Sequence, residues 1–263
     1  MLETGNTHFV AGRYETAPDC FQEAYKMSND MADEICDNTS SYCLEYIGHC
    51  MLNLGDFAKA WPNYKKAIEK RPNETTDEIN QRRLSHLYRK FGLCLYHSDP
   101  TTEAIPKLEM AKDIYSEIDD PETVSAAKWL GDCFWELEEY DNAVKNYMEA
   151  IERRQQSNND LQTDGELASF HYYAGLCLFE LKRFKETITK FEIAKDIYIE
   201  VDDPRVDIAT LWLGDCFRYL GEPEDILKNY EEAKERRQQK LMSQKLMTNG
   251  LSYMGMLESV CLI

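Results

Sequence analysis

The sequence predicts an all-α solenoid of about six helix-turn-helix repeats. Six glycines open the same pattern along the chain: Gly5, Gly48, Gly92, Gly131, Gly175 and Gly214. With small slips, each is followed by a bulky residue three positions on, a turn residue seven on, an aromatic nine on and a small residue twelve on. An aromatic residue or Leu then stands sixteen on, and Ala nineteen on. Positions that recur in register through a chain predict stacked copies of one supersecondary unit.

A second period lies over the first. The fourth and sixth copies share the sequence Trp-Leu-Gly-Asp-Cys-Phe, at 129–134 and 212–217, and the segment 107–121 matches 190–204 at most positions. Long and short glycine intervals also alternate. The genetic unit is therefore predicted to be a pair of repeats, duplicated as a block.

The pattern resembles the tetratricopeptide repeat, a helix-turn-helix unit whose small residues let neighbouring helices approach closely. The resemblance covers nearly the whole chain and implies a right-handed superhelix, read here as one domain over 1–263. Repeats longer than the common form are similar to those of kinesin light chain and the spindle-orientation adaptor LGN. The usual Trp four positions before the glycine is absent, and other residues stand there: Leu44, Tyr88, Ala127, His171 and Thr210.

The repeats are expected at about 1–30, 40–72, 77–118, 121–157, 164–201 and 204–247. Their first helices are expected near 2–11, 40–53, 77–97, 122–137, 164–181 and 205–220. Their second helices are expected near 14–28, 57–71, 102–117, 140–157, 184–200 and 223–247. The first helix is shortened, and both a fragment of a longer array and a divergent natural start remain open as explanations.

Helix ends carry sequence signals of their own. The Asp-Asp-Pro runs at 119–121 and 202–204 predict helix starts in which Asp120 and Asp203 cap, and the prolines take the first helical position. Asn249-Gly250 predicts a stop. The segment after it resembles the sequence around Gly175, so we expect 251–262 to form a C-terminal capping helix. Because this cap is rich in apolar residues, it is also the expected surface for self-association.

Composition narrows the class of protein. The 263 residues are 43% hydrophobic, with no segment resembling a signal peptide or a membrane span, so we expect a cytoplasmic protein, with the nucleus also open. A net charge of −18 argues against nucleic acid as a partner, because phosphate binding requires a basic face. Solubility and preference for a basic protein partner both explain the acidity.

Five of the nine cysteines lie two residues after a repeat glycine: Cys50, Cys94, Cys133, Cys177 and Cys216. This regular position predicts packing, in which reduced Cys acts as a small hydrophobe. Cys20 and Cys261 are the expected reactive exceptions. No Cys-x-x-Cys pair occurs, and neither a metal nor a cofactor is predicted.

The resemblance also implies a binding face, since first helices line the concave side of such arrays. Carried over by offset from each glycine, the predicted peptide-binding residues are His49, Asn53, Arg89, Lys90, Tyr96, Lys128, Asp132, Trp135, Tyr172, Phe179, Asp215 and Arg218. They combine aromatic rings with charges, as binding hot spots do. Trp129 and Trp212 belong either to this face or to the core.

A basic cluster is the place where an acidic ligand could sit, with a solvated helix face as the alternative: Arg82, Arg83, His86, Arg89 and Lys90. The family's carboxylate clamp for chaperone tails is not expected. Its five positions correspond to Leu2, Asn6, Tyr46, His86 and Lys90, of which Asn6 alone matches.

No phosphate-binding loop, metalloprotease pair or nucleophile elbow is present in the sequence. We therefore expect a non-catalytic scaffold or adaptor that binds a peptide segment of a partner protein. Two alternatives are a regulatory or targeting segment of a larger multidomain protein and a self-associating structural unit.

Overall fold

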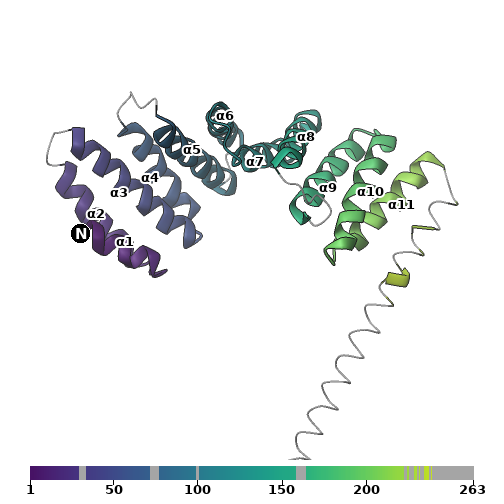
Figure 1. Cartoon of the computed structure of the whole chain (residues 1–263), viewed down its shortest axis with the longest axis horizontal. Helices are drawn as coiled ribbons and strands as arrows, with labels where there is room; N and C mark the ends of the chain where they lie inside the picture. The colour runs from purple at the N-terminus through teal and green to yellow at the C-terminus, as the bar shows by residue number, and fades with distance from the viewer. Residues whose placement is uncertain are drawn as a thin grey trace, which may run out of the picture. The chain divides into compact units, whose positions relative to one another are not determined.

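The computed structural model describes residues 1–29, 34–71, 77–98, 101–157 and 164–221, with separate positions between 224 and 238. Within these residues every regular element is a helix (Figure 1). The helices are α1 (Leu2–Val10), α2 (Ala17–Asn29), α3 (Glu34–Asn53), α4 (Phe57–Glu69), α5 (Glu78–Ser98), α6 (Thr101–Glu117), α7 (Thr123–Glu136), α8 (Tyr140–Ser157), α9 (Gly165–Glu180), α10 (Phe184–Glu200) and α11 (Val206–Leu220).

The helices group into two compact units. Met1–Asn159 holds α1 to α8, and Asp160–Ile263 holds α9 to α11. Inside each unit every helix packs on the next one in the chain, which is the arrangement of stacked helix hairpins (Figure 1). The all-α repeat fold predicted from the sequence is confirmed, while a single domain over 1–263 stays a prediction.

The repeat glycines are explained by close contact between the two helices of a hairpin. A Cβ atom added at Gly131 would lie 2.7 Å from the ring of Tyr147, and one at Gly48 would lie 2.9 Å from Tyr64. The ring stands sixteen residues after the glycine in both hairpins. The same contact joins three further pairs: Gly5 with Phe21, Gly92 with Leu108, and Gly175 with Phe191. Glycine is therefore needed at these positions for lack of space.

The turn position seven residues after the repeat glycine has a left-handed backbone. The φ values are positive at Gly12, Gly55, Glu138, Lys182 and Gly221, between 58° and 75°. This conformation ends the first helix, and the N–H three residues past its last residue donates to an earlier carbonyl, as Asp56 does to Met51 at 2.9 Å. The turn residue read from the sequence is thus the helix stop.

Most predicted helix bounds agree with the structure to within a few residues, and two features differ. The helix predicted at 40–53 begins at Glu34, before the shared pattern starts. At the Asp-Asp-Pro runs, α7 begins at Thr123, two residues after Pro121, so the proline lies in the preceding turn. Asp120 still caps this turn, because its Oδ1 accepts the N–H of Glu122 at 2.9 Å. The offset arises because the chain first completes a turn that this carboxylate stabilises.

Two predicted helices cannot be compared in full. Of the second helix expected at 223–247, the structure describes separate positions, and those are helical. The capping helix expected at 251–262 lies outside the described residues.

The five cysteines that follow the repeat glycines are fully buried, as predicted: Cys50, Cys94, Cys133, Cys177 and Cys216. Burial raises the pKa of Cys94, Cys133 and Cys216 to about 12, and that of Cys50 to about 11. All five are free thiols. They pack inside the hairpins, where the thiolate is disfavoured.

Candidate functional site

In two hairpins, a hydrogen bond joins a residue on the face of the first helix to a buried tyrosine of the second helix. In α7 the Asp132 Oδ1 accepts the hydroxyl of Tyr147 at 2.7 Å. In α3 a 2.7 Å hydrogen bond joins His49 Nδ1 to the hydroxyl of Tyr64. Both tyrosines are buried. Asp132 and His49, predicted as ligand contacts, therefore also satisfy hydroxyl groups of the core.

An ion pair connects α3 to α5. Arg83 Nε donates to Glu45 Oε2 at 2.7 Å, and His49 Nε2 lies 3.5 Å from Glu45 Oε1. Burial alone would raise the pKa of Glu45, but its hydrogen bond with His49 and the charge of Arg83 lower it below the usual value. The carboxylate is thus ionised and neutralised by its neighbours.

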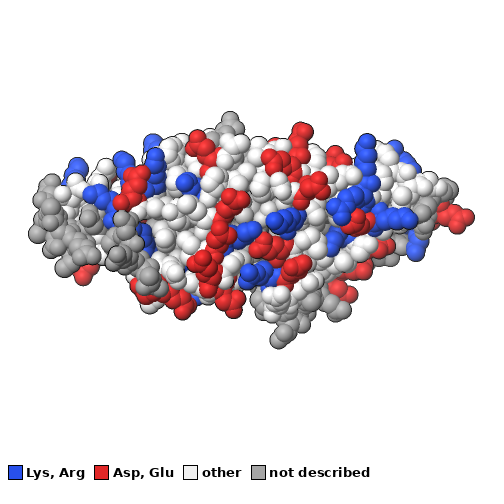
Figure 2. All heavy atoms as spheres, turned by 90° about the horizontal axis from the view of Figure 1, so that it is seen from above, with Lys and Arg blue, Asp and Glu red and all other residues white. Residues whose placement is uncertain are grey.

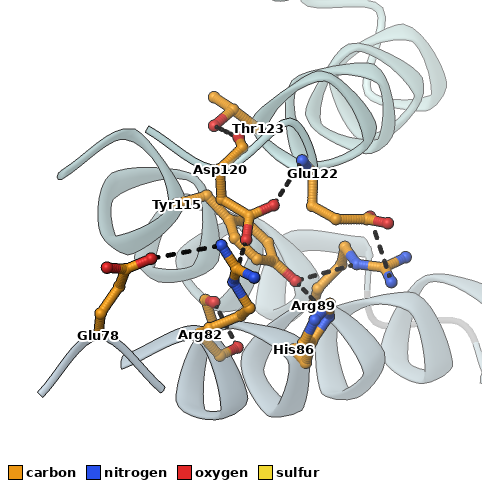
Figure 3. A network of polar contacts seen from close by, with 9 residues as sticks. Glu78, Arg82, His86, Arg89, Tyr115, Asp120, Glu122 and Thr123 are labelled. Carbon is orange, nitrogen blue, oxygen red and sulfur yellow. Dashed lines mark hydrogen bonds and ion pairs between the residues drawn. The ribbon is translucent and has the colours of Figure 1, made fainter. Parts of the chain in front are cut away.

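A polar network joins α5 to the turn before α7 (Figure 3). Arg82 Nε lies 2.7 Å from Oδ2 of the buried Asp120, and its guanidinium also faces Glu78 at 3.5 Å. Two turns further along α5, Arg89 Nη2 lies 3.4 Å from Glu122 Oε2. Figure 3 shows the two guanidinium groups pointing from α5 toward the segment 120–123. Both arginines of this wall are therefore occupied by intramolecular carboxylates.

His86 lies at the centre of the same network. The Arg89 Nε–H donates to the Tyr115 hydroxyl oxygen at 3.4 Å, so the hydroxyl hydrogen is available for His86 Nδ1, which lies 2.8 Å away (Figure 3). Burial, followed by the charge of Arg89, lowers the pKa of His86. His86 is therefore neutral at pH 7, with Nδ1 accepting from Tyr115.

A pocket of about 400 Å³ opens between α3 and α5 in the first unit. Its walls are Glu45, His49, Ile79, Arg82, Arg83, His86, Arg89 and Lys90. All five residues of the basic cluster predicted from the sequence line it. Its volume lies within the range of ligand pockets in proteins.

The end of α5 and the start of α7 carry an aromatic group. Tyr96 meets Trp129 edge to face, with ring centroids 5.6 Å apart, and His97 lies 5.8 Å from the same indole. Lys128 Nζ lies 3.7 Å from the Trp129 ring centroid and 2.5 Å from Asp132 Oδ2. Trp129 packs against the core while staying partly exposed, so it belongs both to the core and to the face.

The two remaining predicted residues of the first unit, Trp135 and Asn53, lie outside the aromatic group around Trp129. Trp135 is partly exposed at the end of α7, with its ring 5.3 Å from that of Tyr140. Asn53 is exposed and donates to the His49 carbonyl of its own helix at 2.8 Å.

The face of the second unit is mainly aromatic. The Phe179 ring lies 5.0 Å from Trp212 and 5.5 Å from both Phe184 and Tyr219. Phe179 and Trp212 pack against the core, whereas Tyr219 is 57% exposed. Tyr172, the other predicted aromatic residue of this unit, also packs against the core.

Charges on α11 complete this face. Arg218 Nη2 lies 3.0 Å from Asp215 Oδ1, and its guanidinium carbon lies 5.0 Å from the ring centroid of Tyr219. The structure thus pairs Asp215 with Arg218, beside the exposed Tyr219.

Sequence reasoning missed the partners of the charged residues. Asp120 was read as a helix cap, and it both caps and receives Arg82. Glu122 and Tyr115 were assigned no role, yet they hold Arg89. Pairing residues at fixed offsets in neighbouring repeats could have found the contact of Arg89 with Glu122, because Arg89 lies in the first helix α5 and Glu122 is the N-cap residue of the next first helix, α7.

The surface shows no large separation of charge on the face seen in Figure 2, where acidic and basic side chains are interspersed. Within the described residues, no group of three His, Cys, Asp or Glu side chains could hold a metal ion. Nor does any helix in the described part of the chain combine the length and apolarity needed to cross a membrane.

Known proteins with this fold are found by sequence and by structure. The family model for the tetratricopeptide repeat matches residues 129–157, which cover the end of α7 and all of α8. No curated protein sequence matches the chain.

Solved structures that share the fold include three that illustrate its range. The crystal structure of BtubC (BKLC) from P. vanneervenii is 18% identical, covers 86% of this chain and 92% of its own, and has a TM-score of 0.62. The MamA protein is 19% identical over 77% of this chain and 94% of its own, with a TM-score of 0.60.

The third is a signal transduction ATPase with numerous domains from Pyrococcus horikoshii, which has a tetratricopeptide repeat sensor. It is 17% identical over 90% of this chain, which spans 35% of that protein, with a TM-score of 0.65. At these identities the likeness is one of fold.

The structure is that of a helical repeat protein, with repeated hairpins, buried small residues and partly exposed first-helix faces. Its sequence motifs contain no catalytic constellation. The family model identifies one tetratricopeptide repeat, at 129–157, and the solved structures show that the chain shares the fold of tetratricopeptide-repeat proteins.

Proposed function

We propose that this protein is a non-catalytic scaffold whose first-helix faces bind peptide segments of a partner protein. The observation that carries the proposal is that large side chains with polar tips stay partly exposed there while intramolecular contacts fix their positions. Tyr219 is held by Phe184 and Arg218, and Trp135 by Tyr140. Fixed aromatic side chains lose little conformational entropy when a ligand binds, and they are common hot spots.

The charges of the same faces support binding of a ligand with both apolar and polar groups. Lys128 with Asp132, and Arg218 with Asp215, form ion pairs beside the aromatic rings. Such pairs leave hydrogen-bonding capacity at the rim of an apolar contact. The faces of the two units are proposed as separate binding surfaces.

A selection of twelve-residue peptides on the full chain tests the proposal. Selected peptides should bind Trp135→Ala or Tyr219→Ala more weakly by about 2 kcal/mol if either ring is a hot spot. Met110→Ala is the matched control, since Met110 is 44% exposed on the second helix α6. Unchanged affinity for both aromatic variants, with the fold intact by circular dichroism, would locate binding elsewhere and overturn the proposal.

A regulatory segment of a larger protein is the second candidate. The finding that favours it is the tetratricopeptide repeat sensor of the Pyrococcus horikoshii ATPase, where this fold is one part of a long chain. Sequencing the complete transcript tests it, because an additional domain in the same reading frame is required.

Self-association through 251–262 remains a third proposal, based on the apolar residues of that segment. Light scattering after size exclusion should show dimers that dissociate when 249–263 are removed. A monomer at all concentrations of the full chain would contradict it.

A further inference from the structure

The first helices of Met1–Asn159 carry five Lys or Arg residues, and four of them have a carboxylate partner. Arg82 pairs with Asp120, Arg83 with Glu45, Arg89 with Glu122 and Lys128 with Asp132. The fifth is Lys90. Among the described residues, no carboxylate, hydroxyl or ring lies within bonding distance of its ammonium group.

Lys90 is not a solvated surface lysine. It is partly buried in α5 and lines the 400 Å³ pocket. Burial, followed by the charge of Arg89, lowers the pKa of its ammonium group. A cation withdrawn from water without a partner costs free energy, and that cost is recovered when an anion binds.

The rest of the pocket wall adds no free negative charge. Glu45 is the one carboxylate that lines it, and the charge of Arg83 already neutralises this group, which also lies 3.5 Å from His49 Nε2. Burial, followed by the charge of Arg89, lowers the pKa of His86, so the imidazole adds no positive charge at neutral pH. The charge pattern therefore leaves one unit of positive charge at the pocket, carried by Lys90.

We propose that the α3–α5 pocket binds one acidic side chain, Asp or Glu, of a partner peptide, with Lys90 as the group that receives the carboxylate. The inference rests on the proposed function and specifies the ligand chemistry of its first-unit face. A single free cation suits a single carboxylate. A chain terminus gripped by several cations does not suit this pocket, because its three arginines are already paired with carboxylates.

The probes are four small anions presented to the full chain labelled with ¹³C-lysine. They are a capped peptide containing one Glu, the same peptide with Gln, the Gln peptide with a free C-terminal carboxylate, and inorganic phosphate. We expect the Glu peptide to shift the Lys90 side-chain resonance saturably, and the capped Gln peptide to leave it unchanged. Equal shifts with Glu and Gln, or tighter binding of phosphate or of the free terminus, would overturn the assignment.

Lys90→Met separates a binding role from a structural one. It keeps the length of the apolar stem and removes the unpaired charge. We expect the Glu peptide to bind about tenfold more weakly, because a charge-assisted hydrogen bond is lost. We also expect the melting temperature to rise by about 2–4 °C, because a partly buried cation without a partner is removed.

Lys65→Met is the matched control, since it removes the same charge from an exposed position on α4. It should change neither the melting temperature nor the affinity for the Glu peptide. Equal affinity of Lys90→Met and the unmodified chain for that peptide would refute the anion site.

The outcomes for the two proposals differ. If Trp135→Ala weakens selected peptides but Lys90→Met does not alter Glu-peptide binding, the scaffold function stands and the anion site falls. If Lys90 alone responds and the aromatic variants do not, the pocket binds a carboxylate and the aromatic faces are not the peptide site.

Discussion

The buried hydroxyl of Tyr147 donates a 2.7 Å hydrogen bond to Asp132, across the hairpin formed by α7 and α8. These residues stand one and sixteen positions after Gly131. In the repeat of Gly48 the same two positions hold His49 and Tyr64, again joined at 2.7 Å. In two repeats whose sixteenth position lacks a hydroxyl, at Leu108 and Phe191, the first position is apolar: Leu93 and Leu176 respectively. The Gly5 repeat differs, because Phe21 is combined there with the polar Asn6.

A double-mutant cycle tests this coupling. Asp132→Leu alone should destabilise the fold by about 1–3 kcal/mol, because the Tyr147 hydroxyl is 1% exposed and loses its acceptor. Adding Tyr147→Phe, which reproduces the Leu and Phe pair of the Gly175 repeat, should recover about 1 kcal/mol or more. Urea unfolding of the four proteins measures the coupling, and additive effects would contradict it.

The left-handed turns predict substitutions that stabilise the protein. Glu138 and Lys182 hold φ values of 58° and 59°, and both side chains are exposed. Replacing either by Gly should raise the free energy of unfolding by about 0.5–1 kcal/mol, since a left-handed residue with a Cβ is strained. Gly55→Ala is the reciprocal control. Its new Cβ would meet no atom within 4 Å, so a loss of about 1 kcal/mol would arise from the backbone alone.

Close packing at the repeat glycines gives a prediction of the opposite sign. Gly131→Ala would bring a Cβ atom within 2.8 Å of three carbons of the Tyr147 ring. We expect a loss of about 1–3 kcal/mol from overpacking. Gly165→Ala, at the start of α9, is the control, because its nearest neighbour would lie 3.9 Å away. Chemical denaturation should show that variant to be at least as stable as the parent.

The sequence was sufficient for the fold because its pattern encodes helix contacts directly. The spacing of sixteen between Gly131 and Tyr147 reports a contact across a hairpin, and the turn residue Gly55 reports a helix end. Both are local relationships that recur in each copy. The start of α3 at Glu34 escaped prediction because it lies before the shared pattern.

The candidate site was less predictable, because its charges pair between repeats. The sequence placed Arg89 and Lys90 side by side and could not distinguish them. In the structure both residues line the pocket, but Arg89 is held by Glu122 and Tyr115, whereas Lys90 has no carboxylate partner among the described residues. This difference depends on which way adjacent residues of α5 point after packing, and a repeat pattern does not contain that information.

His171 makes stability depend on pH in the acid range. It is 2% exposed, neither ring nitrogen has a hydrogen-bond partner among the described residues, and burial together with the charge of Lys190 lowers its pKa to about 4. Below about pH 6.5 the unfolded chain binds a proton that the folded chain does not. Stability should therefore be unaffected by this group above pH 6.5, fall as the pH decreases, and level off below about pH 4.

The variant His171→Leu isolates this contribution. The difference in unfolding free energy between variant and parent should grow by roughly 3 kcal/mol between pH 7 and pH 4, because 2.5 pH units separate the two pKa values. The variant should also be more stable at pH 7, where the parent buries an unpaired imidazole. A difference that does not change with pH would show that His171 takes up its proton in the folded state.

Thiol labelling tests the packing of the cysteines. Six described thiols are buried, and burial raises the pKa of those at 43 and 50 to about 11 and of those at 94, 133 and 216 to about 12. At pH 7.5 their thiolate fraction is small and reagent access requires opening of a hairpin. Cys20 is partly exposed on α2 and should react first among the described cysteines. Cys20→Ser should remove one fast equivalent while the slow phase keeps its amplitude, and 6 M guanidinium should make every remaining thiol react rapidly. Fast reaction of the buried six in the native protein would contradict the packing assigned to them.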